Sequence, residues 1–221
     1  MTTTYPCEAM TKVKICGITR PADAEAAVAH GAWAIGLNHW DGTKRQIDPA
    51  TAAEIGQTLK RQVEMVGVFV NPTLEEVANA VENAELTMVQ LHGEEGPSFC
   101  AEVARRTGTK VIKAFNVRTA ADLTAAEAYR TDYHMLDGFQ RDTPGGTGRT
   151  FDWQLASERR SKIPMILAGG LTPENVTEGI EVTKPFAIDI ASGVESEPGV
   201  KDPEKLRALF EAVPGAVPTE A

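Results

Sequence analysis

Short apolar runs and longer amphipathic stretches alternate along most of the chain. The apolar runs are rich in β-branched and aromatic residues and are bounded by glycine, proline or polar residues, which is typical of buried strands. Between them, apolar residues recur every three or four positions, which is typical of helices that bury one face. The pattern predicts strands at residues 13–19, 34–40, 64–70, 87–92, 110–117, 134–139, 164–170 and 186–192.

The amphipathic stretches predict helices between these strands and after the last one. Two of them carry a start signal, because Thr172-Pro173 and Asp202-Pro203 each fit an N-cap residue followed by proline at the first helical position. The helical ranges that the pattern indicates most clearly are 21–31, 50–62, 73–84, 97–108, 173–183 and 202–213.

Eight strand–helix units follow one another, with connections short enough for parallel crossovers. Strands that are apolar on both sides, each paired with a helix, favour a parallel sheet covered by helices. An open doubly wound sheet is one alternative, but it usually has about five or six strands, whereas eight repeats favour a closed (β/α)8 barrel. Because no internal linker divides the chain, we expect one α/β domain over 12–212, an N-terminal extension (1–11) and a C-terminal tail (213–221).

The composition is ordinary for a soluble globular protein, with 42% hydrophobic and 24% charged residues among 221. No stretch approaches the ~18 apolar residues of a membrane span. The opening residues have neither the basic nor the apolar region of a secretory signal. The net charge is -9 and the Lys and Arg residues are dispersed, which disfavours nucleic acid as a partner. A small anionic substrate is compatible with this charge, because a pocket can be locally positive on an acidic protein.

The three cysteines, Cys7, Cys16 and Cys100, are odd in number, far apart and without a C-x-x-C spacing. These features argue against a disulfide framework and against a zinc site, and they predict a reducing cytoplasm as the location. Cys7 lies outside the repeat and Cys100 lies within a predicted amphipathic helix, so we interpret both as structural or incidental.

In a (β/α)8 barrel the active site lies at the C-terminal ends of the strands, so polar residues there are candidates for chemistry. Cys16 is either a small buried core residue or a general base, if a nearby positive charge lowers its pKa. Asp137 lies in an otherwise apolar strand, where it is either an acid that points into the barrel mouth or half of a salt bridge. The same two interpretations apply to Asp189 in the last predicted strand.

Two further candidates are cationic or titratable. His92 ends the fourth predicted strand, where a lone histidine is more often a hydrogen-bonded residue than a catalyst. Arg45 follows the second strand and could hold a carboxylate through two hydrogen bonds, although solvated surface is the commoner position of a loop arginine.

Three glycine-rich turns follow the sixth, seventh and eighth predicted strands. They contain Gly145-Gly146, Gly169-Gly170 and Ser192-Gly193, and paired glycines let backbone N–H groups approach an anion closely. Each turn alone is weak evidence, since Gly-Gly is common in turns. Because barrels often bind phosphate after strands 7 and 8, the last two turns together predict a phosphate site.

Six longer motifs contain most of these residues. They are VKICGIT (13–19), VGVFVN (66–71), VQLHG (89–93), LDGFQRDTPGGTGRTFDW (136–153), LAGGLTPENV (167–176) and DIASGVESEPGVKD (189–202). In combination, these motifs resemble the phosphoribosylanthranilate isomerase family over residues 12–212. The resemblance implies that Cys16 is the general base and Asp137 the general acid. It also implies that Arg45 holds the anthranilate carboxylate, that His92 and Asp189 line the substrate pocket, and that Gly146, Gly170, Ser192 and Gly193 bind phosphate.

The reaction implied by the resemblance is an Amadori rearrangement of a phosphosugar, without metal or organic cofactor, in tryptophan biosynthesis. The resemblance is compatible with a protein that is a monomer or a homodimer. The loop over 36–45 departs from the family, because Asn38, His39 and Lys44 are unusual there and Ser-Pro is missing before Arg45. Two alternatives therefore stay open: an isomerase that takes a different amine, and a phosphosugar-binding barrel without activity.

Overall fold

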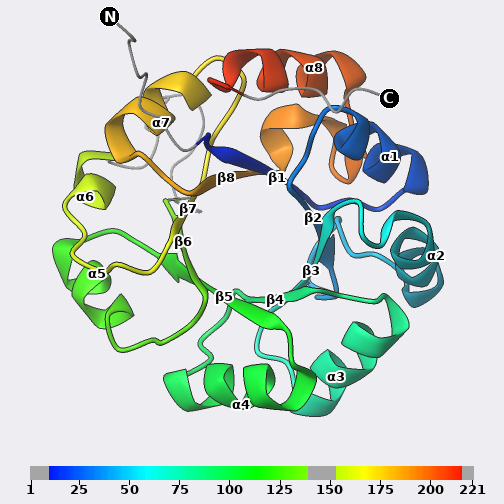
Figure 1. Ribbon diagram of the computed structural model, residues 1–221, viewed down its shortest axis with the longest axis horizontal. Helices are drawn as coiled ribbons and strands as arrows, with labels where there is room; N and C mark the ends of the chain where they lie inside the picture. The colour runs from blue at the N-terminus through cyan, green and yellow to red at the C-terminus, as the bar shows by residue number, and fades with distance from the viewer. Residues whose placement is uncertain (1–9, 139–152, 216–221) are drawn as a thin grey trace, which may run out of the picture.

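The computed structural model describes residues 10–138 and 153–215. Eight parallel strands pair in chain order and close into one barrel, because β1 hydrogen-bonds to β8 as well as to β2 (Figure 1). The predicted (β/α)8 barrel is confirmed, and the open sheet is excluded by this closure. The strands are β1 Lys12–Cys16, β2 Ala34–Asn38, β3 Glu64–Phe69, β4 Met88–Leu91, β5 Lys110–Asn116, β6 Tyr133–Asp137, β7 Met165–Ala168 and β8 Ala187–Ile190.

Helices surround the barrel as an outer ring (Figure 1). They cover the outward side chains of the strands, such as Val13 and Ile15, which join the large outer core. Lys14 and Cys16 alternate with these residues and therefore project into the barrel. The helices are α1 Pro21–Ala29, α2 Pro49–Leu59, α3 Leu74–Asn83, α4 Pro97–Thr107, α5 Ala120–Ala126, α6 Trp153–Ser157, α7 Val176–Thr183 and α8 Pro203–Ala212.

All eight predicted strands are present, and each ends one to three residues earlier than the apolar pattern indicates. One helix start is confirmed: the Asp202 side chain accepts hydrogen bonds from the backbone N–H groups of Glu204 and Lys205. The start predicted at Thr172-Pro173 is wrong, because α7 begins at Val176. The backbone N–H of Thr172 instead donates to the Asn175 side chain, which forms a turn before the helix.

The segment between β8 and α8 contains three short elements that were not predicted. A 3-10 helix, η1 Ser192–Val194, leads into a two-stranded antiparallel hairpin made of β9 Glu195–Glu197 and β10 Val200–Lys201. This hairpin places charged residues beside the end of the barrel where β1 and β8 finish.

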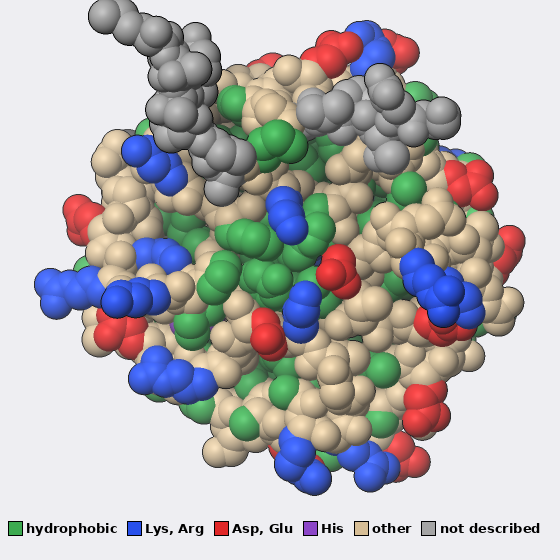
Figure 2. All heavy atoms as spheres, in the orientation of Figure 1, with side chains coloured by type: hydrophobic (Ala, Val, Ile, Leu, Met, Phe, Trp, Pro, Cys, Tyr) green, Lys and Arg blue, Asp and Glu red, His purple; other side chains and the backbone are tan. Residues whose placement is uncertain are grey.

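The opposite end of the barrel, where the strands begin, is closed by aromatic side chains. Trp33 contacts both Tyr133 and Phe186 edge to face, with ring centroids 5.7 and 5.3 Å apart. The Lys12 ammonium lies 5.3 and 5.0 Å from the Trp33 and Phe186 centroids, within cation–π range. Figure 2 shows hydrophobic side chains gathered at the centre of this face. Among the described residues, no helix is long and apolar enough to span a membrane.

Candidate active site

A cavity of about 810 Å³ opens at the C-terminal ends of the strands. Its lining takes residues from, or just after, every one of the eight barrel strands. Seven of the nine predicted site residues lie in that lining: Cys16, Arg45, His92, Asp137, Gly170, Asp189 and Ser192. Gly193 lies just behind it, and Gly146 lies outside the described residues.

Cys16 shares the barrel interior with a buried ion pair. The Lys14 ammonium is completely buried and donates to Asp189 Oδ1 at 2.7 Å. Gly36 lies opposite Cys16 on β2, and a Cβ atom there would come within 2.7 Å of Cys16 Sγ and 3.0 Å of Lys14 Nζ. The missing side chain of Gly36 therefore leaves room for both the thiol and the ammonium. Asp189 forms the salt bridge that one of the two interpretations predicted, and it also lines the cavity; its role as an acid stays a prediction.

The environment of Cys16 raises the pKa of its thiol. Burial is the main cause and the Asp189 carboxylate adds to it, while the ammonium groups of Lys14 and Lys201 act in the opposite direction. The positive charges that a general base needs are thus present, but their effect on the pKa of Cys16 does not outweigh burial. The pKa of Lys14 is raised, because its interactions with Asp189 and Cys16 outweigh its own burial.

Asp137 faces the cavity beside His92. His92 Nε2 lies 3.2 Å from Asp137 Oδ2, and the Gln90 amide nitrogen lies 3.1 Å from His92 Nδ1. An amide nitrogen can only donate, so Nδ1 accepts and the ring proton of neutral His92 lies on Nε2, where it can donate to Asp137. His92 is therefore a hydrogen-bonded histidine that orients a carboxylate.

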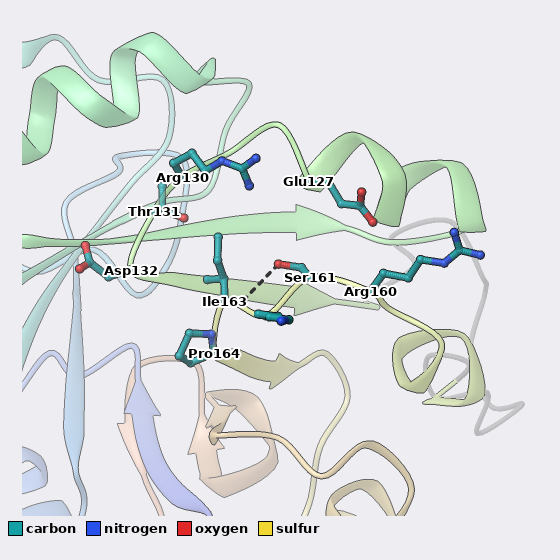
Figure 3. A pocket seen from close by; sticks show the side chains of 9 residues that line it. Glu127, Arg130, Thr131, Asp132, Arg160, Ser161, Ile163 and Pro164 are labelled. Atoms are coloured by element: carbon teal, nitrogen blue, oxygen red, sulfur yellow. Dashed lines mark hydrogen bonds between the residues drawn. The ribbon is translucent and has the colours of Figure 1, made fainter.

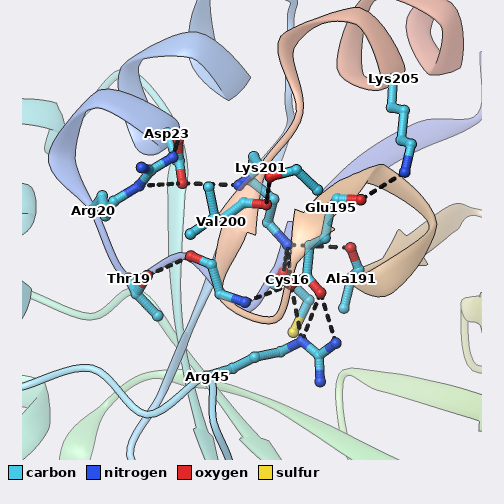
Figure 4. A network of polar contacts seen from close by, with 12 residues as sticks. Cys16, Thr19, Arg20, Asp23, Arg45, Ala191, Glu195, Val200, Lys201 and Lys205 are labelled. Carbon is cyan, nitrogen blue, oxygen red and sulfur yellow. Dashed lines mark hydrogen bonds and ion pairs between the residues drawn. The ribbon is translucent and has the colours of Figure 1, made fainter.

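Arg45 is held by an acid that the sequence does not single out. Its Nε and Nη2 atoms donate to both oxygens of Glu195, over 2.6 to 3.1 Å. Lys201 donates to the same carboxylate at 2.9 Å and to the Cys16 carbonyl at 2.6 Å (Figure 4). Arg45 still lines the cavity, so the predicted loop cation is neither free nor fully solvated.

The loops after β7 and β8 meet at the rim of the cavity. Gly169 and Gly170 have φ values of +92° and +67°, the left-handed region that glycine adopts without strain. A Cβ atom on Gly193 would collide with the Leu171 carbonyl, so the two loops can lie against each other only because this position is glycine. The arrangement brings backbone groups of both turns to one place, as expected of an anion site.

The unusual loop after β2 contributes unequally to the cavity. Asn38 and Trp40 belong to the lining, and the Asn38 side chain accepts a hydrogen bond from the Trp40 backbone N–H. His39 instead stacks on Phe69, with ring centroids 5.0 Å apart. Burial lowers the pKa of His39 to about 4. Of the three unusual residues of this loop, Asn38 therefore lines the cavity, whereas His39 and Lys44 do not belong to its lining.

A second cavity, of about 590 Å³, lies before β6 and β7, at the other end of the barrel (Figure 3). Arg130, Asp132 and Arg160 are among its lining residues, and none of the predicted site residues belongs to it. Only the cavity at the strand ends gathers an acid, a thiol and paired glycines among the residues that the structure describes.

The residues match the model of the family described as N-(5'phosphoribosyl)anthranilate (PRA) isomerase over positions 13–212. The chain belongs to this PRA isomerase family. It is 46% identical to the N-(5'-phosphoribosyl)anthranilate isomerase of Geotalea uraniireducens, over 93% of this chain and 100% of that protein. It is 43% identical to the isomerase of Geobacter sulfurreducens over the same shares.

Solved PRA isomerase structures have the same fold. The enzyme from Thermotoga maritima superposes with a TM-score of 0.86 at 39% identity, covering 93% of this chain and 100% of that one. The enzyme from Thermus thermophilus gives 0.81 at 43% identity, covering 91% and 98%. The chain therefore resembles PRA isomerases along nearly its whole length, in sequence and in fold.

Three charged residues beside the cavity of this PRA isomerase family member are not among the predicted site residues. Lys14 had a usable signal, since it stands two positions before Cys16 in a strand and so shares its face. Glu195 and Lys201 lie in the motif over 189–202, but they follow the last barrel strand in a turn-rich segment where no predicted strand end marks them. Their partner Arg45 lies 150 positions from Glu195 along the chain.

Proposed function

We propose that the protein converts N-(5'-phosphoribosyl)anthranilate into 1-(2-carboxyphenylamino)-1-deoxyribulose 5-phosphate by an acid–base Amadori rearrangement. The observation that carries the proposal is one cavity, at the strand ends of a PRA isomerase family member, that is lined by both Cys16 and Asp137. A related structure, 39% identical, is a PRA isomerase in complex with reduced 1-(o-carboxyphenylamino)-1-deoxyribulose 5-phosphate. That ligand is the reduced form of the product proposed here.

Asp137 acts as the general acid in this proposal. It gives a proton to the ring oxygen of the ribose, the bond from that oxygen to C1' breaks, and the nitrogen lone pair forms a C1'=N double bond. His92 supports the step because its Nε2 atom lies 3.2 Å from Asp137 Oδ2 and so orients the carboxyl group toward the substrate. The acid must be protonated when the substrate binds, so turnover by this route falls as pH rises through the pKa of the acid in the complex.

Cys16 acts as the general base in the next step. Its thiolate removes the C2' proton, the electrons of that bond form C1'=C2', and the nitrogen becomes neutral. The resulting enol gains a proton at C1' and loses one from O2', which yields the ketone. Solvent then returns the proton from Cys16 to Asp137, so all protons balance. The ammonium groups of Lys14 and Lys201 stabilise the thiolate.

Binding is divided among three parts of the cavity. The glycine-containing loops after β7 and β8, with Gly170, Ser192 and Gly193, take the phosphate. Arg45 takes the carboxylate of the anthranilate, and the neighbouring Trp40 offers an aromatic face to its ring. Asp189 lines the same cavity and accepts a hydrogen bond from a sugar hydroxyl.

The test is a fluorescence assay that follows the disappearance of phosphoribosylanthranilate. Wild-type protein is expected to turn it over, and Asp137→Asn is expected to lower kcat by a factor on the order of 10². Asp132→Asn, at the other end of β6, is the matched control and is expected to keep full activity. Absence of turnover by folded wild-type protein, judged by circular dichroism, would leave the alternatives of a different amine substrate or a non-catalytic barrel.

The assembly expected from the resemblance is a monomer or a homodimer, and we favour the homodimer. Support comes from a structure 38% identical to this chain, which is described as mutually generated monomers of the dimeric PRA isomerase from Thermotoga maritima. Light scattering on the purified protein distinguishes a particle of 23.7 kDa from one of twice that mass.

A further inference from the structure

We propose that Glu195 is a positioning residue that fixes the guanidinium group of Arg45 for the carboxylate of the substrate. The inference rests on the proposed function, in which Arg45 meets that carboxylate. It assigns a task to a buried acid that lies on the hairpin after β8 and takes no part in the proton transfers.

The geometry of the pair leaves one side of the guanidinium available. Arg45 Nε lies 2.9 and 3.1 Å from the two oxygens of Glu195, and Nη2 lies 2.6 Å from Oε2. Nη1 has no partner among the described residues, and Figure 4 shows it pointing away from Glu195. A guanidinium can bind one carboxylate along its Nε–Nη2 edge and a second through Nη1 and the remaining Nη2 hydrogen. Glu195 uses the first edge and thereby orients the second.

The aliphatic part of the Arg45 side chain is restrained as well as its guanidinium group. A Cβ atom on Gly17 would lie 2.7 Å from Arg45 Cδ, so the aliphatic part of Arg45 lies directly on this glycine. Gly17 has a φ of +73° and immediately follows Cys16. Glu195 at one end and Gly17 at the other thus restrict a long side chain that would otherwise lose considerable rotamer entropy on binding a ligand.

Lys201 holds the other side of Glu195. Its fully buried Nζ donates to Glu195 Oε1, to the Cys16 carbonyl at 2.6 Å and to the Ala191 carbonyl at 3.2 Å. Three acceptors require three hydrogens, so Lys201 is the charged ammonium. The hydrogen bond from Arg45 and the charge of Lys201 lower the pKa of Glu195 despite its burial, so the acid is ionised at neutral pH.

The charges of the three side chains in this cluster do not cancel one another. Arg45 and Lys201 are cations and Glu195 is an anion, which leaves one net positive charge beside the cavity. A substrate carboxylate would balance it. A purely structural ion pair would need only Lys201 and Glu195, whereas here the acid also reaches an arginine that lines the cavity.

The test measures binding of two ligands by calorimetry. One is reduced 1-(o-carboxyphenylamino)-1-deoxyribulose 5-phosphate, and the other is the same compound without the carboxyl group. Glu195→Gln is expected to weaken binding of the first about tenfold and of the second about twofold or less, because only the first uses the oriented guanidinium. The matched control is Glu197→Gln, on the exposed part of the same hairpin, which is expected to change neither affinity.

A double-mutant cycle separates positioning from a structural role. In an Arg45→Ala background, Glu195→Gln is expected to weaken binding of the carboxylate ligand by less than about twofold more, because the two residues act through one contact. Equal losses for both ligands, or losses that multiply in the double variant, would overturn the inference. If Glu195→Gln does not fold, Arg45→Lys replaces it, since that variant keeps the charge and the Glu195–Lys201 pair. An Arg45→Lys variant that retains the wild-type preference for the carboxylate ligand would equally overturn the inference.

The outcomes also separate this inference from the proposed function. If the wild-type protein neither turns over phosphoribosylanthranilate nor binds the carboxylate ligand, both are wrong. If wild-type turnover is normal and Arg45→Ala loses the carboxylate preference while Glu195→Gln keeps it, only the role of Glu195 is wrong.

Discussion

The two ends of the barrel use the same eight strands for different purposes. Where the strands begin, Trp33, Tyr133 and Phe186 pack edge to face or tilted against one another. Where they end, the interior holds the ion pair of Lys14 and Asp189 and opens into the cavity. At the first end aromatic rings contact one another, whereas the second end keeps a buried ion pair beside an open cavity.

The two ends are therefore expected to contribute differently, the aromatic end to stability and the charged end to activity. Aromatic packing stabilises the fold by removing apolar area from water. Buried charges destabilise a fold unless they are paired, so a site that contains several of them indicates a function other than stability. We therefore expect substitutions at the two ends to have opposite signatures, and four predictions test this, from the largest effect to the smallest.

Cys16→Ala is expected to give the largest effect, a loss in kcat on the order of 10² or more, because the general base is removed. The free energy of unfolding should change little by comparison, since the side chain is small. Steady-state kinetics and urea denaturation measure the two quantities. Cys100→Ala, a buried cysteine in α4, is the matched control and should keep full activity. Near-normal turnover by Cys16→Ala would show that another group is the base.

Phe186→Ala should give the converse result at the closed end. It removes an aromatic ring that contacts Trp33 and Tyr133, so we expect a loss of about 2 kcal/mol in the free energy of unfolding, with kcat unchanged at a temperature where the variant is folded. Urea denaturation at 25 °C gives the stability. A fall in kcat comparable to that of Cys16→Ala would mean that the two ends are not separable.

Asp189→Asn should shift the titration of Cys16. The Asp189 carboxylate contributes to raising the thiol pKa, so its removal lowers that pKa and moves the alkylation of Cys16 to lower pH. In the wild-type protein we expect iodoacetamide to react slowly at neutral pH and faster as pH rises above the ordinary thiol value of about 8.5. Peptide mass spectrometry follows Cys16 and Cys100 separately. A profile for Cys16 that does not move would contradict the electrostatic coupling.

His39→Phe should give the smallest effect on activity, because His39 packs against Phe69 and does not belong to the lining of the cavity. Burial lowers the pKa of His39 to about 4, so the fold favours its neutral form. The contribution of neutral His39 to the free energy of unfolding is complete above the unfolded pKa of about 6.5 and is lost as pH falls toward about 4. We expect the variant, which retains an aromatic ring against Phe69, to lose about 2 kcal/mol less unfolding free energy than wild type between pH 7 and pH 4.5. Equal losses in urea titrations at pH 7 and pH 4.5 would contradict it.

The site was predictable where the signal is local. Cys16 and Asp137 stand at the ends of strands, and the repeat count alone places strand ends at the mouth of a barrel. Gly170 and Gly193 follow strands in turns that glycine favours. In contrast, the α7 start at Thr172-Pro173 was misplaced, because an N-cap pattern also fits a turn in which Asn175 accepts the hydrogen bond.

The number, order and type of the barrel's elements could be predicted from the sequence, because hydrophobic periodicity indicates which face of each segment is buried. Which charged residues meet at the C-terminal end of the barrel could be seen only in the tertiary structure. Asp189 lies 175 positions from Lys14, and Lys201 lies 185 positions from Cys16. Such pairs form because β8 closes against β1, and a periodic pattern indicates that a face is buried without specifying which distant side chain it meets there.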